Sequence, residues 1–178
     1  MAELQIRRLA PADAESAAAL IREAFAAQSV ATDPPSSALR ETASSVAAHL
    51  AEGGGAGLEA GARLVGLVLW AVRDDGLYLG RLAVSPPWRG QGAARALIGE
   101  GETEARRRGL PRVHVRVRIA LEENRRLFSA CGFKESERGA HPGYAKATYL
   151  VMEKALGGET LTRSGRCLQW DGTAQKGG

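Results

Sequence analysis

Apolar and polar positions near the start of the chain predict one strand followed by two helices. Residues 4–9 alternate apolar and polar side chains, as a short half-buried strand does. Pro11 suits a first helical turn. One face of the helix that follows is apolar: Ala17, Leu20, Ile21, Ala24 and Phe25. After a loop at 28–37, a second helix is predicted over about 38–52, with Leu39, Val46 and Leu50 as its apolar residues.

The middle of the chain predicts an antiparallel meander of three strands. Apolar runs of strand length cover 56–59, 64–72 and 77–84. Gly61 marks a turn between the first two runs, and Asp74-Asp75-Gly76 marks a turn before the third. Pro86 and Pro87 end the third strand, because proline has no backbone N–H for the ladder.

A longer helix follows from Ala93. Small and apolar residues share one of its faces: Ala94, Leu97, Ile98, Gly101 and Ala105. Gly109 and Pro111 are typical of a helix end. Valines then alternate with His114, Arg116 and Arg118 in a strand over 113–117. Because a helix separates the two strands, we expect this strand to run parallel to 77–84.

The remaining pattern completes the predicted fold. A short helix over 124–131 ends at Gly132, and two strands, 134–138 and 147–156, flank a turn at His141-Pro142-Gly143. The fold class is therefore mixed α/β, with a mostly antiparallel sheet of six to seven strands and about four helices, in one domain over 3–156. Residues 157–178 are rich in Gly, Ser, Thr and Gln, and we expect a C-terminal tail that is flexible or docks through 167–170.

Composition narrows the class of protein. The 178 residues are 44% hydrophobic and 25% charged, as in soluble globular domains. No apolar run approaches the ~18 residues of a membrane span, and the N-terminus lacks the apolar core of a signal peptide. Two cysteines, Cys131 and Cys167, fit a reducing compartment, so we expect a cytoplasmic protein. The net charge of +4 favours a small anionic ligand and is too dispersed for nucleic acid.

The turn Arg89-Gly90-Gln91-Gly92 is the most informative stretch. No Ser, Thr, Asp or Asn caps the helix that follows it, and Arg89 and Arg95 place cations at the end where the helix dipole disfavours them. Glycines there let a ligand approach the backbone. A bound anion, most naturally a phosphate, reconciles these features. The alternative is a tight glycine turn with solvated arginines. A P-loop and a dinucleotide fingerprint are excluded, since the first lacks Gly-Lys-Ser/Thr and the second has Arg95 at its third glycine.

Two motifs resemble the GNAT superfamily of N-acetyltransferases. The signature Arg/Gln-x-x-Gly-x-Gly/Ala matches Arg89 to Ala94, and a short helix ending in Gly-Phe matches Asn124 to Phe133. The predicted element order, β-α-α-β-β-β-α-β-α-β-β over about 3–156, agrees with this family. The resemblance implies that acetyl-coenzyme A is the acyl donor. Its expected binding residues are Leu82, Ala83 and Val84 for the pantetheine arm, the backbone of Arg89, Gly90, Gln91, Gly92, Ala93, Ala94 and Arg95 for the pyrophosphate, and Asn124 and Phe128 on the short helix.

The resemblance also implies direct attack by an amine on the acetyl thioester, without a covalent enzyme intermediate. The family often has a tyrosine acid four residues after the asparagine, where this chain has Phe128. Candidates for the acid or base are Tyr78, His141, Tyr144 and Glu137, each of which also has a packing, turn or surface interpretation. Cys131 is interpreted as a packing residue at a helix end. His49, His114 and His141 lack metal-ligand spacing, so no metal site is expected.

The predicted function is therefore N-acetylation of an amine on a small molecule or peptide. The alternative, favoured by Phe128, is an acyl-coenzyme A-binding sensor without strong catalysis. The acceptor would be set by the 28–37 loop, the second helix and the 135–147 loop. Asp33, Glu135 and Glu137 either attract a cationic amine or are solvated surface carboxylates, the interpretation we favour. No membrane or nucleic-acid partner is expected, and a homodimer, common in the family, is left open.

Overall fold

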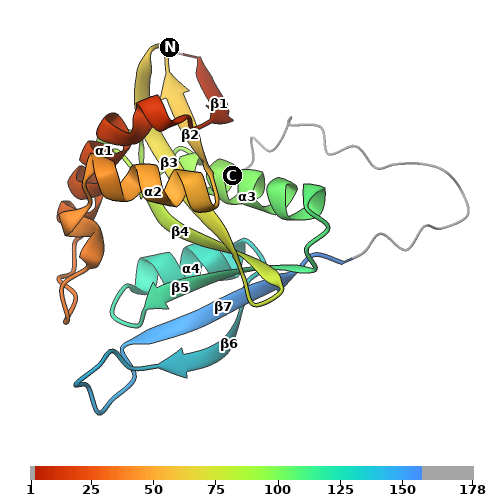
Figure 1. Cartoon of the computed structure of the whole chain (residues 1–178). Helices are drawn as coiled ribbons and strands as arrows, with labels where there is room; N and C mark the ends of the chain where they lie inside the picture. The colour runs from red at the N-terminus through yellow and green to blue at the C-terminus, as the bar shows by residue number, and fades with distance from the viewer. Residues whose placement is uncertain (1–2, 158–178) are drawn as a thin grey trace, which may run out of the picture.

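A computed structural model describes residues 3–157, in which a single sheet organises the chain. The sheet has seven strands in the order β1-β2-β3-β4-β5-β7-β6 (Figure 1). The strands are β1 Leu4–Arg8, β2 Gly55–Ala60, β3 Arg63–Arg73, β4 Gly76–Val84, β5 Arg112–Arg118, β6 Lys134–Gly139 and β7 Tyr149–Ala155. The helices are α1 Ala14–Ala26, α2 Ala43–Glu52, α3 Ala93–Arg107 and α4 Glu122–Ala130, with 3₁₀ turns at Pro11–Asp13, Ser37–Arg40 and Pro86–Trp88.

The predicted topology is confirmed. Strands β2, β3 and β4 form the antiparallel meander, and β5 runs parallel to β4 after the crossover through α3. Every other neighbouring pair is antiparallel, which gives the mixed, mostly antiparallel sheet expected from the sequence.

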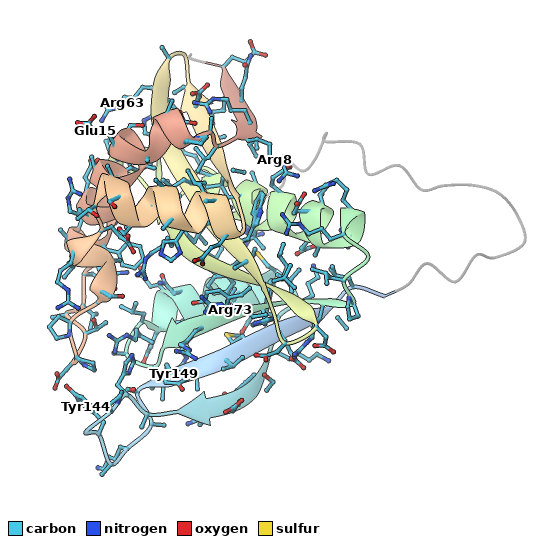
Figure 2. All side chains as sticks on the ribbon, viewed as in Figure 1. Arg8, Glu15, Arg63, Arg73, Tyr144 and Tyr149 are labelled. Carbon is cyan, nitrogen blue, oxygen red and sulfur yellow. The ribbon has the colours of Figure 1, made fainter. Side chains whose placement is uncertain are left out.

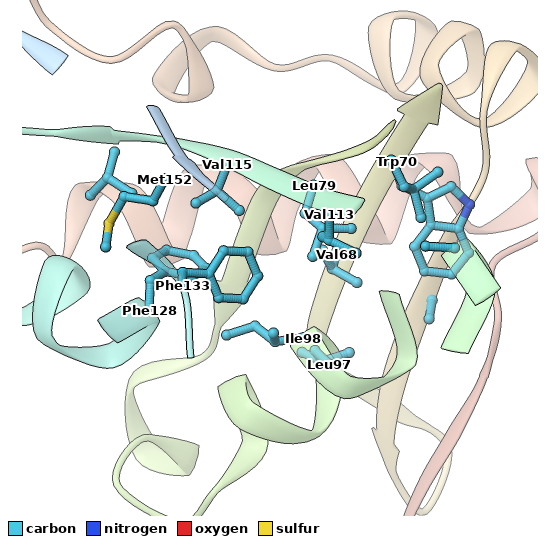
Figure 3. Packing of buried hydrophobic residues seen from close by; sticks show 14 of the residues in the cluster. Val68, Trp70, Leu79, Leu97, Ile98, Val113, Val115, Phe128, Phe133 and Met152 are labelled. Carbon is cyan, nitrogen blue, oxygen red and sulfur yellow. The ribbon is translucent and has the colours of Figure 1, made fainter. Parts of the chain in front are cut away.

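The helices form layers on the two faces of the sheet. Helices α1 and α2 cover one face, with Ile21 and Val46 packed around Leu67, Leu69 and Ala83 (Figure 1). On the opposite face, α3 and α4 bring Leu97, Ile98 and Phe128 into one apolar cluster with Val68, Val113 and Met152 (Figure 3). Alternate residues of β3 thus serve the two cores, as the two-residue period of a strand requires.

A bulge in β4 shapes the centre of the sheet. Leu67 lies opposite Ala83 and Leu69 opposite Gly80, so one β3 residue faces two residues of β4. Arg81, within the bulge, has a positive φ of 52°. Strand β5 pairs with β4 only over Leu77 to Leu79. Because a bulge bends its strand, β4 and β5 separate beyond Leu79, and the β5-facing edge of β4 is left without a strand partner in the described residues.

The structure corrects three details of the prediction. The second helix is not continuous over 38–52: it is a 3₁₀ turn and then α2, because Thr42 and Ser45 form a capping box that starts a new helix at Ala43. Leu39 is 39% exposed and is not a core residue. Helix α4 begins at Glu122 rather than Asn124, with Glu122 and Glu123 in its first turn, where acidic residues suit the dipole. Strand β1 has both faces exposed instead of one.

The predicted C-terminal tail, including the docking of 167–170, lies outside the residues that the structure describes, which end at 157. Within residues 3–157, no helix has the length and apolar composition needed to span a membrane.

A buried carboxylate ties the edge of the sheet to the end of α3. Glu104 is 1% exposed and accepts hydrogen bonds from Arg8 of β1, from Arg107 Nε at 2.9 Å and from Arg108 Nε at 2.6 Å. Figure 2 shows Arg8 beside α3. The guanidinium of Arg107, helped by Arg8 and Arg108, holds the pKa of Glu104 well below its usual range although burial acts to raise it. Glu104 thereby neutralises part of the positive charge that these three arginines bring together.

Replacing this carboxylate should destabilise the fold. Glu104→Gln removes the only negative charge of the cluster among the described residues, and we expect the free energy of unfolding at pH 7 to fall by about 3 kcal/mol. Because the pKa of Glu104 is lowered on folding, its contribution is present above the usual glutamate pKa and is lost as pH falls, so the variant should lose less stability in acid than the wild type.

Urea unfolding at several pH values measures both effects. Glu100→Gln, on the same helix and half-buried, is the matched control and should change stability by less than about 0.5 kcal/mol. Equal losses in the two variants would contradict the role assigned to Glu104.

Candidate functional site

A large cavity lies where β4 and β5 separate. Its volume is about 1160 Å³, and its walls include 80–84 of β4, 115–118 of β5 and the start of α4. A second cavity of about 440 Å³ surrounds the glycine turn and the start of α3. The two share the lining residues Val84, Arg89, Ala94 and Leu127. The sheet opening and the glycine turn therefore belong to one region.

The start of α3 has the bare backbone that the sequence predicts. Gly92 is the N-cap at φ 84° and Gly90 has φ 72°, and no side chain of the N-cap residue bonds the helix. The first N–H groups of the helix have no partner within it. A Cβ added at Gly90 or Gly92 would meet no described atom within 4 Å. Open space thus lies over an uncapped, electropositive helix end.

The side chain of Arg89 has a different role from the one expected. Its guanidinium donates to the carbonyls of Ala24 at 2.8 Å and Ala27 at 3.2 Å, at the C-terminus of α1, and its Nε donates to the carbonyl of Val84 at 3.1 Å. A cation is favourable at a helix C-terminus. Arg89 is an exposed residue, but its guanidinium is bound at the end of α1, and its side chain joins α1 to the glycine turn.

The free edge of β4 forms one wall of the large cavity. On one side, Ala83 and Val84 pair with Leu67 and Gly66 of β3. On the other, β5 has ended its pairing at Val115. The backbone groups of Leu82 and Ala83 on that side are available to an extended ligand, in the same way that a strand edge accepts another strand, whereas the carbonyl of Val84 already accepts from Arg89 Nε.

Helix α4 supplies the opposite wall. Asn124 and Phe128 both line the cavity. Phe128 is 6% exposed, and its ring packs edge-on against Phe133 at 5.4 Å between centroids (Figure 3). Phe128 thus offers an apolar surface and no proton.

Of the acid or base candidates, Tyr78 and His141 line the cavity, and Tyr144 does not. The ring of Tyr78 lies below the guanidinium of Arg73 at 4.5 Å and 5.6 Å from the ring of His114. Tyr144 donates its hydroxyl hydrogen to Asp33, which raises the pKa of Tyr144. Glu137 lies on the exposed strand β6, also outside the lining.

His141 is held in the late loop by Thr148. Its Nδ1 is within hydrogen-bond reach of Thr148 Oγ1 and 3.5 Å from a guanidinium nitrogen of Arg118. Burial, and then the charges of Arg118 and Arg116, lower the pKa of His141 below its usual 6.5. The imidazole is therefore neutral at pH 7 and can accept a proton.

The sequence interpretation missed the arginines of this cavity. Arg116 and Arg118 were assigned only to a strand, with no role in a site, yet both line the cavity, as does Arg73. Arg118 donates to the carbonyl of Pro34 at 2.5 Å, so β5 holds the 28–37 loop. The alternation of Arg116 and Arg118 with core valines was the available signal, since it places both side chains on the face away from α3 and α4.

The remaining chemistry of the site is limited. Among residues 3–157, no cluster of three His, Cys, Asp or Glu side chains could hold a metal ion. Cys131 is half-buried beside the apolar cluster, and burial raises the pKa of its thiol, which disfavours a thiolate nucleophile.

Comparison with known proteins places this site in context. The model of the Acetyltransferase (GNAT) family matches residues 18–133, which include the glycine turn, the parted strands and α4. No curated protein matches the sequence at a significant level.

Solved structures share the fold. PaiA N-acetyltransferase from Thermoplasma acidophilum, in complex with coenzyme A, is 18% identical with a TM-score of 0.73 and covers 86% of this chain and 99% of its own. The ribosomal-protein-S18-alanine N-acetyltransferase from Escherichia coli is 21% identical with a TM-score of 0.69, covering 89% and 99%. The acetyltransferase yncA from Salmonella typhimurium, solved with acetyl-CoA, is 18% identical with a TM-score of 0.66, covering 88% and 96%.

The environment of His141 gives a direct test of this geometry. Because the charge of Arg118 lowers the pKa of His141, Arg118→Gln should raise that pKa toward 6.5. NMR titration of the imidazole measures it. Arg63→Gln, at the far end of β3 (Figure 2), is the control and should leave the titration unchanged. A histidine that titrates above 6.5 in the wild type would contradict the described surroundings.

Proposed function

Because the chain belongs to the Acetyltransferase (GNAT) family, we propose that it transfers the acetyl group of acetyl-CoA to an amine of a small molecule or peptide. The family membership makes the chain an acetyltransferase with acetyl-CoA as its donor. The observation that carries the assignment of the site is the bare N-terminus of α3 next to the free edge of β4.

The described residues fit coenzyme A. The uncapped N–H groups at 92–95 suit the pyrophosphate, and Gly90 and Gly92 leave the space it needs. The edge of β4 at Leu82 and Ala83 suits the two amides of the pantetheine arm, as an added strand would. Asn124 and Phe128 would contact the arm from α4, with Leu127 adding apolar surface. Titration of coenzyme A into the protein should reveal micromolar binding.

The neighbouring structures support this placement of the donor. One contains coenzyme A and another acetyl-CoA. Their likeness to this chain is one of fold, and the assignment of individual residues here rests on the geometry above.

Transfer requires a neutral amine and a means of protonating the thiolate. The donor supplies an activated acyl group as a thioester. An alkyl amine with a pKa near 10 is only about one part in a thousand neutral at pH 7, so a base increases the reactive fraction. His141 is neutral and lines the cavity. We assign it as the base that accepts the proton of the amine. Tyr78 is the tyrosine in the described lining of the cavity. We assign it, in place of Phe128, as the acid that protonates the leaving thiolate.

The second candidate function is an acyl-coenzyme A sensor without turnover. Phe128 favours it, since a helix that lacks a proton donor weakens catalysis without weakening binding. A thiol-release assay over amines and peptide N-termini separates the two functions, because turnover with any acceptor excludes the sensor.

The glycine turn provides a test with a matched control. Gly92 and Gly109 both have positive φ, of 84° and 69°, and an added Cβ would meet nothing within 4 Å at either position. Alanine therefore strains the backbone equally at the two ends of α3. We expect Gly92→Ala to weaken coenzyme A binding about tenfold or more by calorimetry, with Gly109→Ala unchanged within about twofold.

The two variants should lose similar amounts of stability in thermal unfolding, which separates the local backbone strain from ligand contact. Equal coenzyme A affinity in Gly92→Ala and Gly109→Ala, or no binding to the wild type, would remove the basis of the proposal.

Replacing the two tyrosines should have unequal effects. Tyr78→Phe should lower kcat about 100-fold, since it removes the hydroxyl in the cavity, and coenzyme A affinity should stay unchanged. Tyr144→Phe should lower kcat less than about threefold, because that hydroxyl bonds Asp33 outside the cavity. In the Tyr78→Phe background, Phe128→Tyr should restore part of kcat. Equal effects of the two single variants would assign the acid elsewhere.

A further inference from the structure

The acceptor end of the cavity carries positive charge from two strands, β3 and β5. Core residues of β5 alternate with His114, Arg116 and Arg118, so these side chains lie on the face of the sheet away from α3 and α4. Arg73, from the end of β3, lies over Tyr78 on β4, and Tyr149, opposite Arg118, begins β7. Figure 2 shows Arg73 and Tyr149 on this lower part of the sheet. Arg73, Arg116 and Arg118 all line the cavity.

These arginines differ from Arg81 and Arg112, which carboxylates hold. Arg81 pairs with Glu41, and Arg112 pairs with Asp75 and Glu153. Within residues 3–157, no carboxylate lies within 4 Å of the guanidinium groups of Arg73, Arg116 or Arg118. Their contacts are a tyrosine ring for Arg73, a tyrosine ring for Arg116 at 4.3 Å, and for Arg118 the carbonyl oxygen of Pro34 and Nδ1 of His141.

The acidic residues that face the cavity lie elsewhere. Glu122 and Glu123 line it at the first turn of α4, and Glu122 pairs with Arg126 at 3.4 Å. Asp33, Glu135 and Glu137, the carboxylates considered for a cationic amine, are absent from its described lining. Glu135 is instead paired with Arg138. Asp33 acts on Arg118 through its charge, but the lining of the cavity has more arginines than carboxylates, so the cavity favours negative charge.

Stacking leaves the arginines able to bind a ligand. A guanidinium that lies over an aromatic ring contacts it through its flat face, while its N–H donors point outward in the plane. That edge matches two oxygens of a carboxylate or phosphate group. Tyr149 and Tyr78 hold Arg116 and Arg73 in this manner, and Pro34 fixes Arg118.

We propose that the acceptor carries an anionic group, a carboxylate or a phosphate, in addition to its amine, and that Arg116 and Arg118 bind this group. The inference rests on the proposed acetyltransferase function and specifies its substrate class. The same arginines disfavour the protonated form of the bound amine, so they assist its deprotonation and select against polycationic amines.

Pairs of acceptors that differ only in the anionic group test the proposal. One arm compares the kcat/KM of amino acids with that of their carboxamides, and a second compares phosphoethanolamine with ethanolamine. Spermidine represents polycationic amines. With saturating acetyl-CoA, we expect an anionic acceptor to exceed its neutral partner in kcat/KM by about tenfold or more, and the arm that shows this identifies carboxylate or phosphate.

Variants separate this effect from differences in amine basicity. Arg116→Gln should lower kcat/KM for the anionic acceptor about tenfold or more, mainly through KM, and for its neutral partner less than about threefold. Arg118→Gln should show the same selective loss, together with a change in kcat that both acceptors share, because Arg118 also lowers the pKa of His141. Coenzyme A affinity should stay unchanged. Arg63→Gln, an exposed arginine at the opposite end of β3, should change none of these values.

Failure of this inference is distinct from failure of the proposed function. Turnover that prefers neutral amines or spermidine, with no selective loss in Arg116→Gln or Arg118→Gln, overturns the inference and leaves the acetyltransferase intact. If no amine is acetylated, the proposed function fails in this panel, and calorimetry of the coenzyme A-saturated protein with the same anionic amines decides the inference. Binding that Arg116→Gln abolishes supports the anion site, and absence of binding overturns it.

Discussion

The separation of β4 from β5 is the constraint on which the rest of the site depends. A sheet gains stability from continuous hydrogen bonding, yet these two strands pair only from Leu77 to Leu79. The bulge at Arg81 ends that pairing, and Arg81 is held by the buried carboxylate of Glu41 and by Ser37. The unpaired edge, the cavity and the path to the glycine turn all follow from one local irregularity. Bulges occur often beside functional sites for this reason.

The two cores keep the opening from closing. Helix α3 packs so closely on β4 that a Cβ at Gly101 would lie 2.6 Å from Leu79, and Phe128 and Phe133 fill the space beneath β5 (Figure 3). On the other face, α1 and α2 fix β3 and β4 from the opposite side. Since each half of the sheet has its own packing partners, the strands diverge without collapsing onto each other.

Much of the fold was accessible from the sequence because its signals are local. The valines of β5, the small face of α3 and the turn at Asp74-Asp75-Gly76 each specify one element through spacing or turn chemistry, and the crossover rule then sets the parallel pair. The break before α2 was missed although Thr42 and Ser45 form a capping box, because the apolar spacing through Leu39 suggested a continuous helix. The bulge at Arg81 had no local signal, since an arginine at positive φ is set by its tertiary partner Glu41.

The candidate site also has parts that the sequence predicts and parts that depend on the tertiary fold. The glycine turn could be predicted because the missing cap and the glycines are properties of adjacent residues. The positive charge of the proposed acceptor end could not, since the fold brings Arg73 of β3 and Arg116 of β5 to one cavity, over Tyr78 and Tyr149 respectively. The hydrogen-bond partners of the Arg89 side chain could not be predicted either, because Ala24 and Ala27 lie more than sixty positions earlier in the chain.

The contacts of the Arg89 side chain also connect the two ends of the cavity. Arg89 anchors the turn at the start of α3 to the last turn of α1, from which the 28–37 loop departs toward Arg118 and Tyr144. The Arg89 side chain therefore links the glycine turn to the end of α1 and, through it, to the 28–37 loop. A shift of the turn on ligand binding would reach the 28–37 loop through this side chain, and linkage would then require the effect to be equal in both directions. A single guanidinium therefore connects the proposed donor site to the proposed acceptor site.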